Sequence, residues 1–148
     1  MLTSIVVANH GRDLTRLRMT LPKNVEFIEV DIGKERSEQR NIGIKLAKGD
    51  IVIWLDSDQT ISQEAIKDCQ ELISMGYKSV YFKEVIVAES FFGRIRNFER
   101  SFYTGTAIDV PRGVLKIVCP LFNEELNRLF YKCYCLQLFQ NCLMKKEL

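Results

Sequence analysis

The chain has 148 residues, of which 47% are hydrophobic and 27% are charged. This length fits one domain with a buried core, and this composition is ordinary for a globular protein, so a disordered, collagen-like or coiled-coil chain is excluded. The 21 basic and 19 acidic residues leave a net charge of +2, which gives no support to a general nucleic-acid binder.

Neither a secretory leader nor a membrane span is expected. The apolar run Ile5 to Ala8 is short and follows no basic residue. No run approaches the roughly 18 apolar residues that a membrane helix needs. The five cysteines lack Cys-x-x-Cys spacing, and His10 is the only histidine, so neither a disulfide framework nor a zinc site is predicted. We therefore expect a reduced, cytoplasmic protein.

The first half of the chain alternates between strands and helices. A short, continuous apolar run predicts a strand buried on both faces at Thr3–Ala8, and a similar run predicts a buried strand at Ile51–Leu55. Further strands are predicted at Val25–Val30 and Val80–Ala88. Helical spacing and punctuating residues predict helices from Asp13 to Pro22, from Glu35 to Lys48 with a stop at Gly49, and from the capping box Thr60–Gln63 to Gly76. This β-α-β-α-β-α-β order favours a mostly parallel sheet flanked by helices.

The second half is less regular. Ser90 to Tyr103 mixes aromatic residues with arginines, which suits either a helix that covers the sheet or an amphipathic helix at a membrane or lipid acceptor. Short strands are predicted at Thr106–Val110 and Val114–Val118, and a helix at Asn123–Tyr131. The uncharged run Cys133 to Met144 is too short to span a membrane and is predicted to be a docking or oligomer surface.

Two carboxylates, Asp56 and Asp58, directly follow the buried strand Ile51–Leu55. Ligands of open α/β sheets bind at the carboxyl ends of strands, and residues two apart in an extended chain project to the same side. Two hard oxygen donors suit Mg²⁺ or Mn²⁺, which completes its shell with substrate phosphate oxygens and can neutralise a leaving diphosphate. The alternative is a turn and helix-capping cluster.

The stretch Arg40 to Asp58 resembles the core of family-2 inverting glycosyltransferases with the GT-A fold. Their pattern is an Ala-Arg-Asn-x-Gly-Ile helix, a small-residue turn, an apolar strand and Asp-x-Asp. Asn9 to Leu14 is similar to the segment after their first strand, and Phe98–Arg100 and Phe122–Leu126 are similar to later landmarks. The resemblance implies an α/β, GT-A-like (Rossmann-related) single domain over 1–148. Within it we expect a nucleotide-sugar-binding half at 1–88, a smaller irregular acceptor-side region at 89–131 and an atypical tail at 132–148.

The resemblance also implies roles for individual residues. Ala8 and His10 would face the nucleotide base, and Asp31 the base or ribose. Arg40 would approach the base or diphosphate. Asp56 would hold the ribose or a metal-bound water, and Asp58 would bind Mn²⁺ or Mg²⁺ directly. The implied reaction is metal-dependent, inverting transfer from a nucleotide-diphosphate sugar to the hydroxyl of a glycan, lipid or protein acceptor.

The sequence departs from the family at two places. Asp31 and Arg40 are nine positions apart, where typical members insert a helix and a strand, so Asp31 is alternatively a turn aspartate. The family's Glu-Asp pair, which supplies the catalytic base, is absent from Leu126–Tyr131; Glu125 is chosen as the base before Glu124 and Asp109. A truncated end would explain this. The alternatives are a nucleotide-sugar-binding protein with little transfer, or a GT-A-like sugar nucleotidyltransferase. A homo-oligomer and a peripheral contact with the inner face of the membrane are the further partner expectations.

Overall fold

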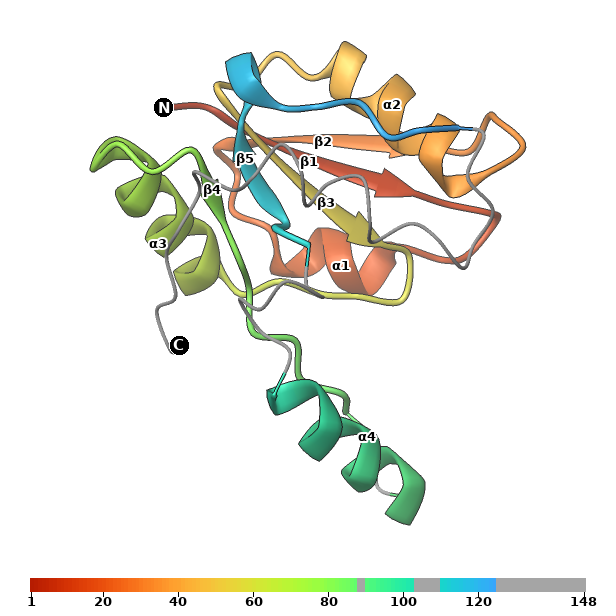
Figure 1. Cartoon of the computed structure of the whole chain (residues 1–148). Helices are drawn as coiled ribbons and strands as arrows, with labels where there is room; N and C mark the ends of the chain where they lie inside the picture. The colour runs from red at the N-terminus through yellow and green to blue at the C-terminus, as the bar shows by residue number, and fades with distance from the viewer. Residues whose placement is uncertain (88–89, 103–109, 125–148) are drawn as a thin grey trace.

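Five strands form one mixed sheet in the computed structural model, whose described residues are 1–87, 90–102 and 110–124. In the order β2-β1-β3-β5-β4, the strands are Val25–Val30, Thr3–Ala8, Ile51–Asp56, Gly113–Leu115 and Ser79–Val80. β1 pairs in parallel with β2 and β3, whereas β5 runs antiparallel to β3 and β4 (Figure 1). Only β5 is therefore reversed among the described strands, and the predicted α/β class with a mostly parallel sheet is confirmed.

Helices cover both faces of the sheet. The helices are α1 at Thr15–Thr20, α2 at Arg36–Leu46, α3 at Gln63–Ser74 and α4 at Phe91–Ser101, and a 3-10 turn follows β5 at Lys116–Val118. α1 and α3 lie on one face of the sheet and α2 on the other (Figure 1). Alternate residues of β1 and β3 therefore enter two cores: Ile5 and Ile53 pack on the α1/α3 side, and Val6 and Trp54 on the α2 side. This explains the continuous apolar runs in both strands.

The α2 side of the core is closely packed. Gly43 faces β1, and a Cβ there would overlap Val6 Cγ1, so the helix axis can approach the strand only with glycine at this position. The Trp54 and Phe122 rings meet edge to face with centroids 5.3 Å apart. Through Phe122, the segment 110–124 becomes part of this core. This contact brings the late part of the chain over the strand that ends in Asp56.

Several boundary predictions are wrong, among them the start of α1, which begins at Thr15 and not at Asp13. The N-cap of α3 is Ser62, whose Oγ accepts a hydrogen bond from the Ala65 backbone N–H at 3.1 Å, and not Thr60. α2 ends at Leu46, and Gly49 serves close packing instead, because a Cβ there would lie 2.6 Å from Ser4 Oγ. β4 is only Ser79–Val80, since its one partner, β5, is three residues long; residues 81–87 are irregular.

The region after β4 also differs from expectation. α4 confirms the predicted helix, but none of its residues is buried, and it extends away from the sheet (Figure 1). The interpretation of α4 as a cover for the sheet is therefore wrong, whereas its contact with a membrane or lipid stays a prediction. β5 with its 3-10 turn replaces the predicted strand Val114–Val118. The strand Thr106–Val110, the helix Asn123–Tyr131 and the tail 132–148 fall wholly or mostly outside the described residues.

Candidate functional site

The carboxyl ends of β1, β2 and β3 meet at one edge of the sheet. Ala8, the last residue of β1, is in register with Val30 on one side and with Asp56 on the other. Asp31 directly follows Val30, so Asp31 and Asp56 lie at the same end of the sheet, as predicted. Ala8 itself is buried between its two neighbouring strands. Parallel pairing thus gathers residues that are up to 48 positions apart in the sequence.

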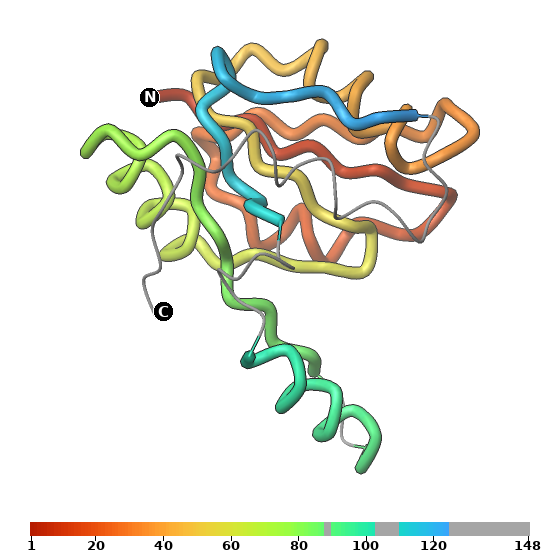
Figure 2. Tube along the Cα trace, viewed as in Figure 1, coloured from red at the N-terminus to blue at the C-terminus, as the bar shows by residue number. Residues whose placement is uncertain are grey.

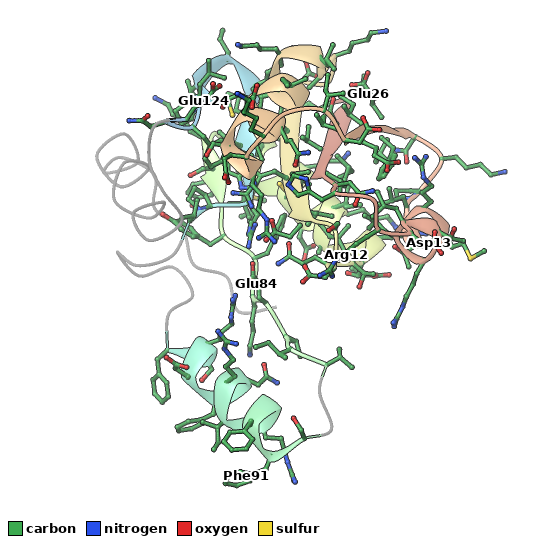
Figure 3. The ribbon with its side chains drawn as sticks, turned by 90° about the vertical axis from the view of Figure 1, so that its right-hand side faces the viewer. Arg12, Asp13, Glu26, Glu84, Phe91 and Glu124 are labelled. Carbon is green, nitrogen blue, oxygen red and sulfur yellow. The ribbon has the colours of Figure 1, made fainter. Side chains whose placement is uncertain are left out.

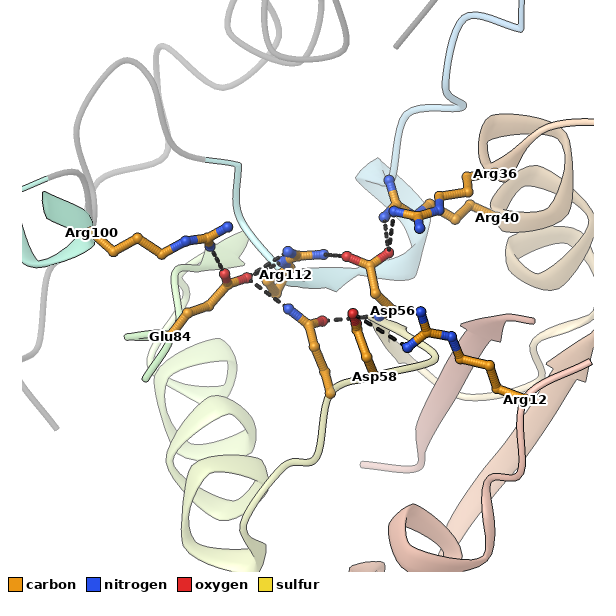
Figure 4. A network of polar contacts seen from close by, with 9 residues as sticks. Arg12, Arg36, Arg40, Asp56, Asp58, Glu84, Arg100 and Arg112 are labelled. Atoms are coloured by element: carbon orange, nitrogen blue, oxygen red, sulfur yellow. Dashed lines mark hydrogen bonds and ion pairs between the residues drawn. The ribbon is translucent and has the colours of Figure 1, made fainter. Parts of the chain in front are cut away.

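Three arginines surround Asp56, two from α2 and one from the residue before β5. Arg40 Nη2 of α2 lies 2.5 Å from Asp56 Oδ1, and Arg36 Nη1, one turn earlier, lies 3.9 Å from the same oxygen. Arg112 Nη1, from the residue before β5, lies 3.6 Å from Asp56 Oδ2 (Figure 4). The Asp56 and Arg40 side chains are 18% and 10% exposed, so this ion pair is largely removed from water. Asp56 thus belongs to a charged cluster, and residues 56–59 also form the turn that was the alternative expectation, with the Gln59 N–H donating to the Asp56 carbonyl at 3.0 Å.

The charges of this cluster set the ionisation of Asp56. Burial raises the pKa of the carboxyl, but the charges of Arg40, Arg112 and Arg36 and the hydrogen bond from Arg40 together lower it by more, so the pKa lies below its ordinary value of 3.8. Asp56 is therefore ionised at neutral pH. The guanidinium of Arg40 also lies over the Phe122 ring, 5.3 Å from its centroid, which shields the ion pair from one side.

Asp58 is in a different environment, although only Ser57 separates it from Asp56. Its carboxylate is 61% exposed, and Arg12 Nη1 lies 3.6 Å from Asp58 Oδ2. Arg12 belongs to a turn after β1 that is built by Asn9, whose side chain accepts from the Arg12 N–H and donates to the Arg12 carbonyl, both at 2.9 Å. Gly11 has a φ of +80° in this turn, which glycine adopts without strain. The turn places His10 and Arg12 at the same edge as Asp58.

Asn41 joins two sequence landmarks that lie 81 positions apart. Its side chain accepts from the Phe122 N–H at 2.7 Å and donates to the Phe122 carbonyl at 2.8 Å. Its amide also donates to Glu124 Oε1 at 2.7 Å. The segment 110–124 consequently runs beside α2 (Figure 2), and Glu124 lies at that edge of the molecule (Figure 3). The Arg-Asn pair of α2 thus has two tasks: Arg40 holds Asp56, and Asn41 holds the Phe122 segment.

The predicted site residues fall into three groups. Ala8, Arg40, Asp56 and Asp58 come together at the strand ends. His10 and Asp31 are exposed at the same edge, and the structure gives neither a role. Glu125, the chosen base, and Asp109 lie outside the described residues. Their catalytic assignment stays a prediction.

Sequence reasoning missed several polar residues that the fold brings to this site. Arg36 lies one helical turn before Arg40, and that spacing could have revealed it. Arg112 directly precedes the short apolar run of β5, and a charged residue just before a predicted strand is a signal that could have revealed it. Glu84, which pairs with Arg112, stands in an irregular segment with no pattern to mark it.

The acidic residues present suit a metal held partly by its substrate. Among residues 1–87, 90–102 and 110–124, no three His, Cys, Asp or Glu side chains form a group that could hold a metal. Mg²⁺ and Mn²⁺ do not require such a group, because they are commonly held by one or two carboxylates with substrate phosphates and water. The exposed carboxylate of Asp58 fits that arrangement. Asp56 is committed to arginines and suits an indirect role.

Comparisons with known proteins agree with this architecture. The model of the family described as Glycosyl transferase family 2 matches residues 10–129. The crystal structure of S. aureus TarS 1-349 resembles the chain with a TM-score of 0.61 at 15% identity, covering 94% of this chain and 55% of that one. A second S. aureus TarS structure has a TM-score of 0.58 at 19% identity, covering 90% of this chain and 33% of that one. At such identities the likeness concerns the fold, and it confirms the GT-A-like architecture.

No curated protein sequence matches the chain. Within the part of the chain that the structure describes, no helix is long and apolar enough to cross a membrane.

Proposed function

The chain belongs to glycosyl transferase family 2, and on that premise we propose that it transfers a sugar from a nucleotide-diphosphate sugar to an acceptor hydroxyl, with inversion. The observation that carries the proposal is the convergence of Asp56, Arg40 and Asp58 at the carboxyl ends of the parallel strands. Ligands of α/β sheets bind at this edge. Here the edge offers both carboxylates for hydroxyl groups and guanidinium groups for phosphates.

The donor is proposed to lie across the ends of β2, β1 and β3. Asp31 and His10 are exposed beside Ala8 and are assigned to the base and ribose. Asp56 accepts hydrogen bonds from donor hydroxyls, because its carboxylate is ionised and rigidly held. The arginines around it leave the site suited to an anionic diphosphate. Arg36 is the most exposed of the three, and its planar guanidinium group can contact two phosphate oxygens.

Asp58 is proposed to bind a divalent metal, Mn²⁺ or Mg²⁺, with the donor phosphates completing its shell. Such a metal stabilises negative charge on a leaving diphosphate. Arg12 lies 3.6 Å from Asp58 in an exposed pair of little energetic weight, so the carboxylate can exchange this partner for another cation. Asp56 does not bind the metal directly in this proposal; its ion pair with Arg40 fixes the orientation of both side chains.

The acceptor side of the site carries the catalytic base in this proposal. Inverting transfer needs a carboxylate that takes the proton of the acceptor hydroxyl. Glu124 is engaged by Asn41, which leaves Glu125 as the assigned base. The competing function is donor binding with little transfer; Glu125→Gln separates the two. If Glu125 is the base, this variant keeps donor affinity and loses about 10²–10⁴-fold in transfer rate.

Thermal unfolding with added ligands tests the donor class. UDP-, GDP- and dTDP-sugars are added separately, each with and without Mn²⁺. A ligand present at about 100 times its Kd and bound only to the folded state stabilises it by about 2.7 kcal/mol. We expect one nucleotide series to raise the midpoint, and more strongly with Mn²⁺. No shift with any donor would overturn the proposed function.

Asp58→Ala tests the metal assignment. In titration calorimetry this variant should lose the Mn²⁺ dependence of donor binding, whereas Asp56→Ala should only weaken it. The reason is that the Asp58 carboxylate is exposed and pairs with Arg12, whereas the Asp56 carboxylate pairs with arginines of α2 and of the residue before β5. Glu64→Ala, an exposed acid on α3, is the control and should bind as wild type. An unchanged Mn²⁺ dependence in Asp58→Ala would refute the assignment.

A further inference from the structure

Glu84 is the centre of a polar network that lies beside the donor site. Glu84 Oε1 accepts hydrogen bonds from Arg112 Nε at 2.9 Å, from Arg112 Nη2 at 2.5 Å and from Gln59 Nε2 at 3.1 Å. Its other oxygen, Oε2, pairs with Arg100 of α4. Glu84 lies between the sheet and α4 (Figure 3). In the close view, Arg112 lies between Glu84 and Asp56, and Arg100 lies on the other side of Glu84 (Figure 4). A side chain from an irregular segment is thereby fixed from three sides.

Two of these contacts lead to Asp56. Gln59 Oε1 accepts a hydrogen bond from the Asp56 backbone N–H at 2.9 Å, while its amide donates to Glu84. Arg112 faces Asp56 Oδ2 with Nη1, while its Nε and Nη2 are held by Glu84. Glu84 therefore acts on Asp56 through both the backbone and the side chain. Glu84 itself contacts Gln59, Arg112 and Arg100, so it acts on Asp56 indirectly.

The distances show a consequence for Asp56. Its Oδ1 is occupied by Arg40 at 2.5 Å. Its Oδ2 is 3.6 Å from Arg112, which is too far for a hydrogen bond. Because Glu84 holds two of the Arg112 N–H groups, Arg112 supplies charge to Asp56 Oδ2 without occupying it. That oxygen keeps acceptor capacity for a ligand hydroxyl.

We propose that Glu84 is a positioning residue for the donor, which holds Arg112 away from Asp56 Oδ2 and so keeps this oxygen available to the hydroxyls of a nucleoside diphosphate. This inference rests on the proposed function, since it assigns Asp56 to the donor. When the Glu84 carboxylate is removed, the Arg112 guanidinium closes on the nearest remaining anion, which is Asp56. Donor and arginine then compete for one oxygen.

The test measures binding of UDP, GDP and dTDP by calorimetry in the presence of Mn²⁺. Glu84→Gln keeps the side-chain shape and removes the charge; we expect about tenfold weaker binding, the size of one hydrogen bond to a charged group. Glu64→Gln, an exposed glutamate on α3, is the matched control and should bind as wild type. Glu84→Asp keeps the charge and should fall between Glu84→Gln and wild type.

The double variant Glu84→Gln/Arg112→Met separates positioning from loss of structure. If Arg112 is what blocks Asp56, removing it as well should restore part of the affinity, and the two effects should not add. Thermal midpoints of all variants are measured alongside. Glu84→Gln with wild-type affinity, or a double variant that binds no better than Glu84→Gln, would overturn the inference. A wild-type protein that binds none of the nucleotides would overturn the proposed function, and the inference with it.

Discussion

Asp56 and Asp58 belong to one motif, yet their replacement should have very different effects on stability. Asp56→Asn removes a charge that three arginines share, and it changes the side-chain shape very little. Arg40 then remains largely buried and loses its ion pair with Asp56. Asp58→Asn removes a charge of the same sign two residues away. The second variant is therefore a matched control for the first.

The magnitude follows from burial. Removing one partner of a buried ion pair costs about 3–5 kcal/mol. Arg40 is 10% exposed and Arg112 is 17% exposed, and Arg112 keeps Glu84, so we expect about 2–3 kcal/mol for Asp56→Asn. The Asp58–Arg12 pair is about 60% exposed on both sides, and such pairs contribute about 0–1 kcal/mol. The difference of about 2 kcal/mol corresponds to about 5–8 °C in the thermal midpoint.

Urea unfolding of the two variants and the wild type, followed by circular dichroism and by tryptophan fluorescence, provides the assay. Trp54 is the only tryptophan, and it is buried in β3 close to Asp56, so its fluorescence reports on this part of the core. Coincidence of the two signals checks that unfolding is two-state. If both variants lose the same free energy of unfolding, or if Asp56→Asn is neutral, the arginine cluster does not carry the stability assigned to it.

Three further predictions concern the frame around the site. Asn41→Ala should lower the free energy of unfolding by about 2–3 kcal/mol, because it leaves buried backbone groups without partners, whereas the exposed control Asn24→Ala should change it by less than about 0.5 kcal/mol in urea titrations. Gly43→Ala should cost about 1–3 kcal/mol through overlap with β1, although alanine favours helices; Lys45→Ala on the exposed face of the same helix should be neutral, and an equally neutral Gly43→Ala would refute the close approach. Because the folded-state pKa of Asp56 is lowered, its stabilisation is fully present above pH 3.8 and is lost as the pH falls through the lower folded value. Unfolding measured from pH 5 to pH 2 should therefore be less pH-dependent in Asp56→Asn than in wild type, and identical slopes would contradict this.

The local sequence pattern located the three neighbouring parallel strands β1, β2 and β3. β1 and β2 have the predicted boundaries, and β3 differs by one residue. β1 and β3 are buried along almost their whole length, and such strands require the apolar run that the sequence displays directly. The position of Asp56 and Asp58 follows from the same run, since they come where the apolar residues stop. The resemblance over Arg40 to Asp58 supplied the GT-A-like fold, because that stretch carries the family's motif from α2 through the end of β3.

Only the tertiary structure decided what these residues contact. The predicted strand Val80–Ala88 shrank to two residues, because the length of an edge strand depends on its partner, which comes from much later in the chain. The partners of Asp56 are likewise set by distant segments: Arg40 by the packing of α2 on β1, and Arg112 by the antiparallel return of β5. Glu84 reaches Arg112 only after that return. Spacing along a chain fixes which side chains share a helix face or a strand face, whereas ion pairs between elements depend on register and packing, which no local pattern encodes.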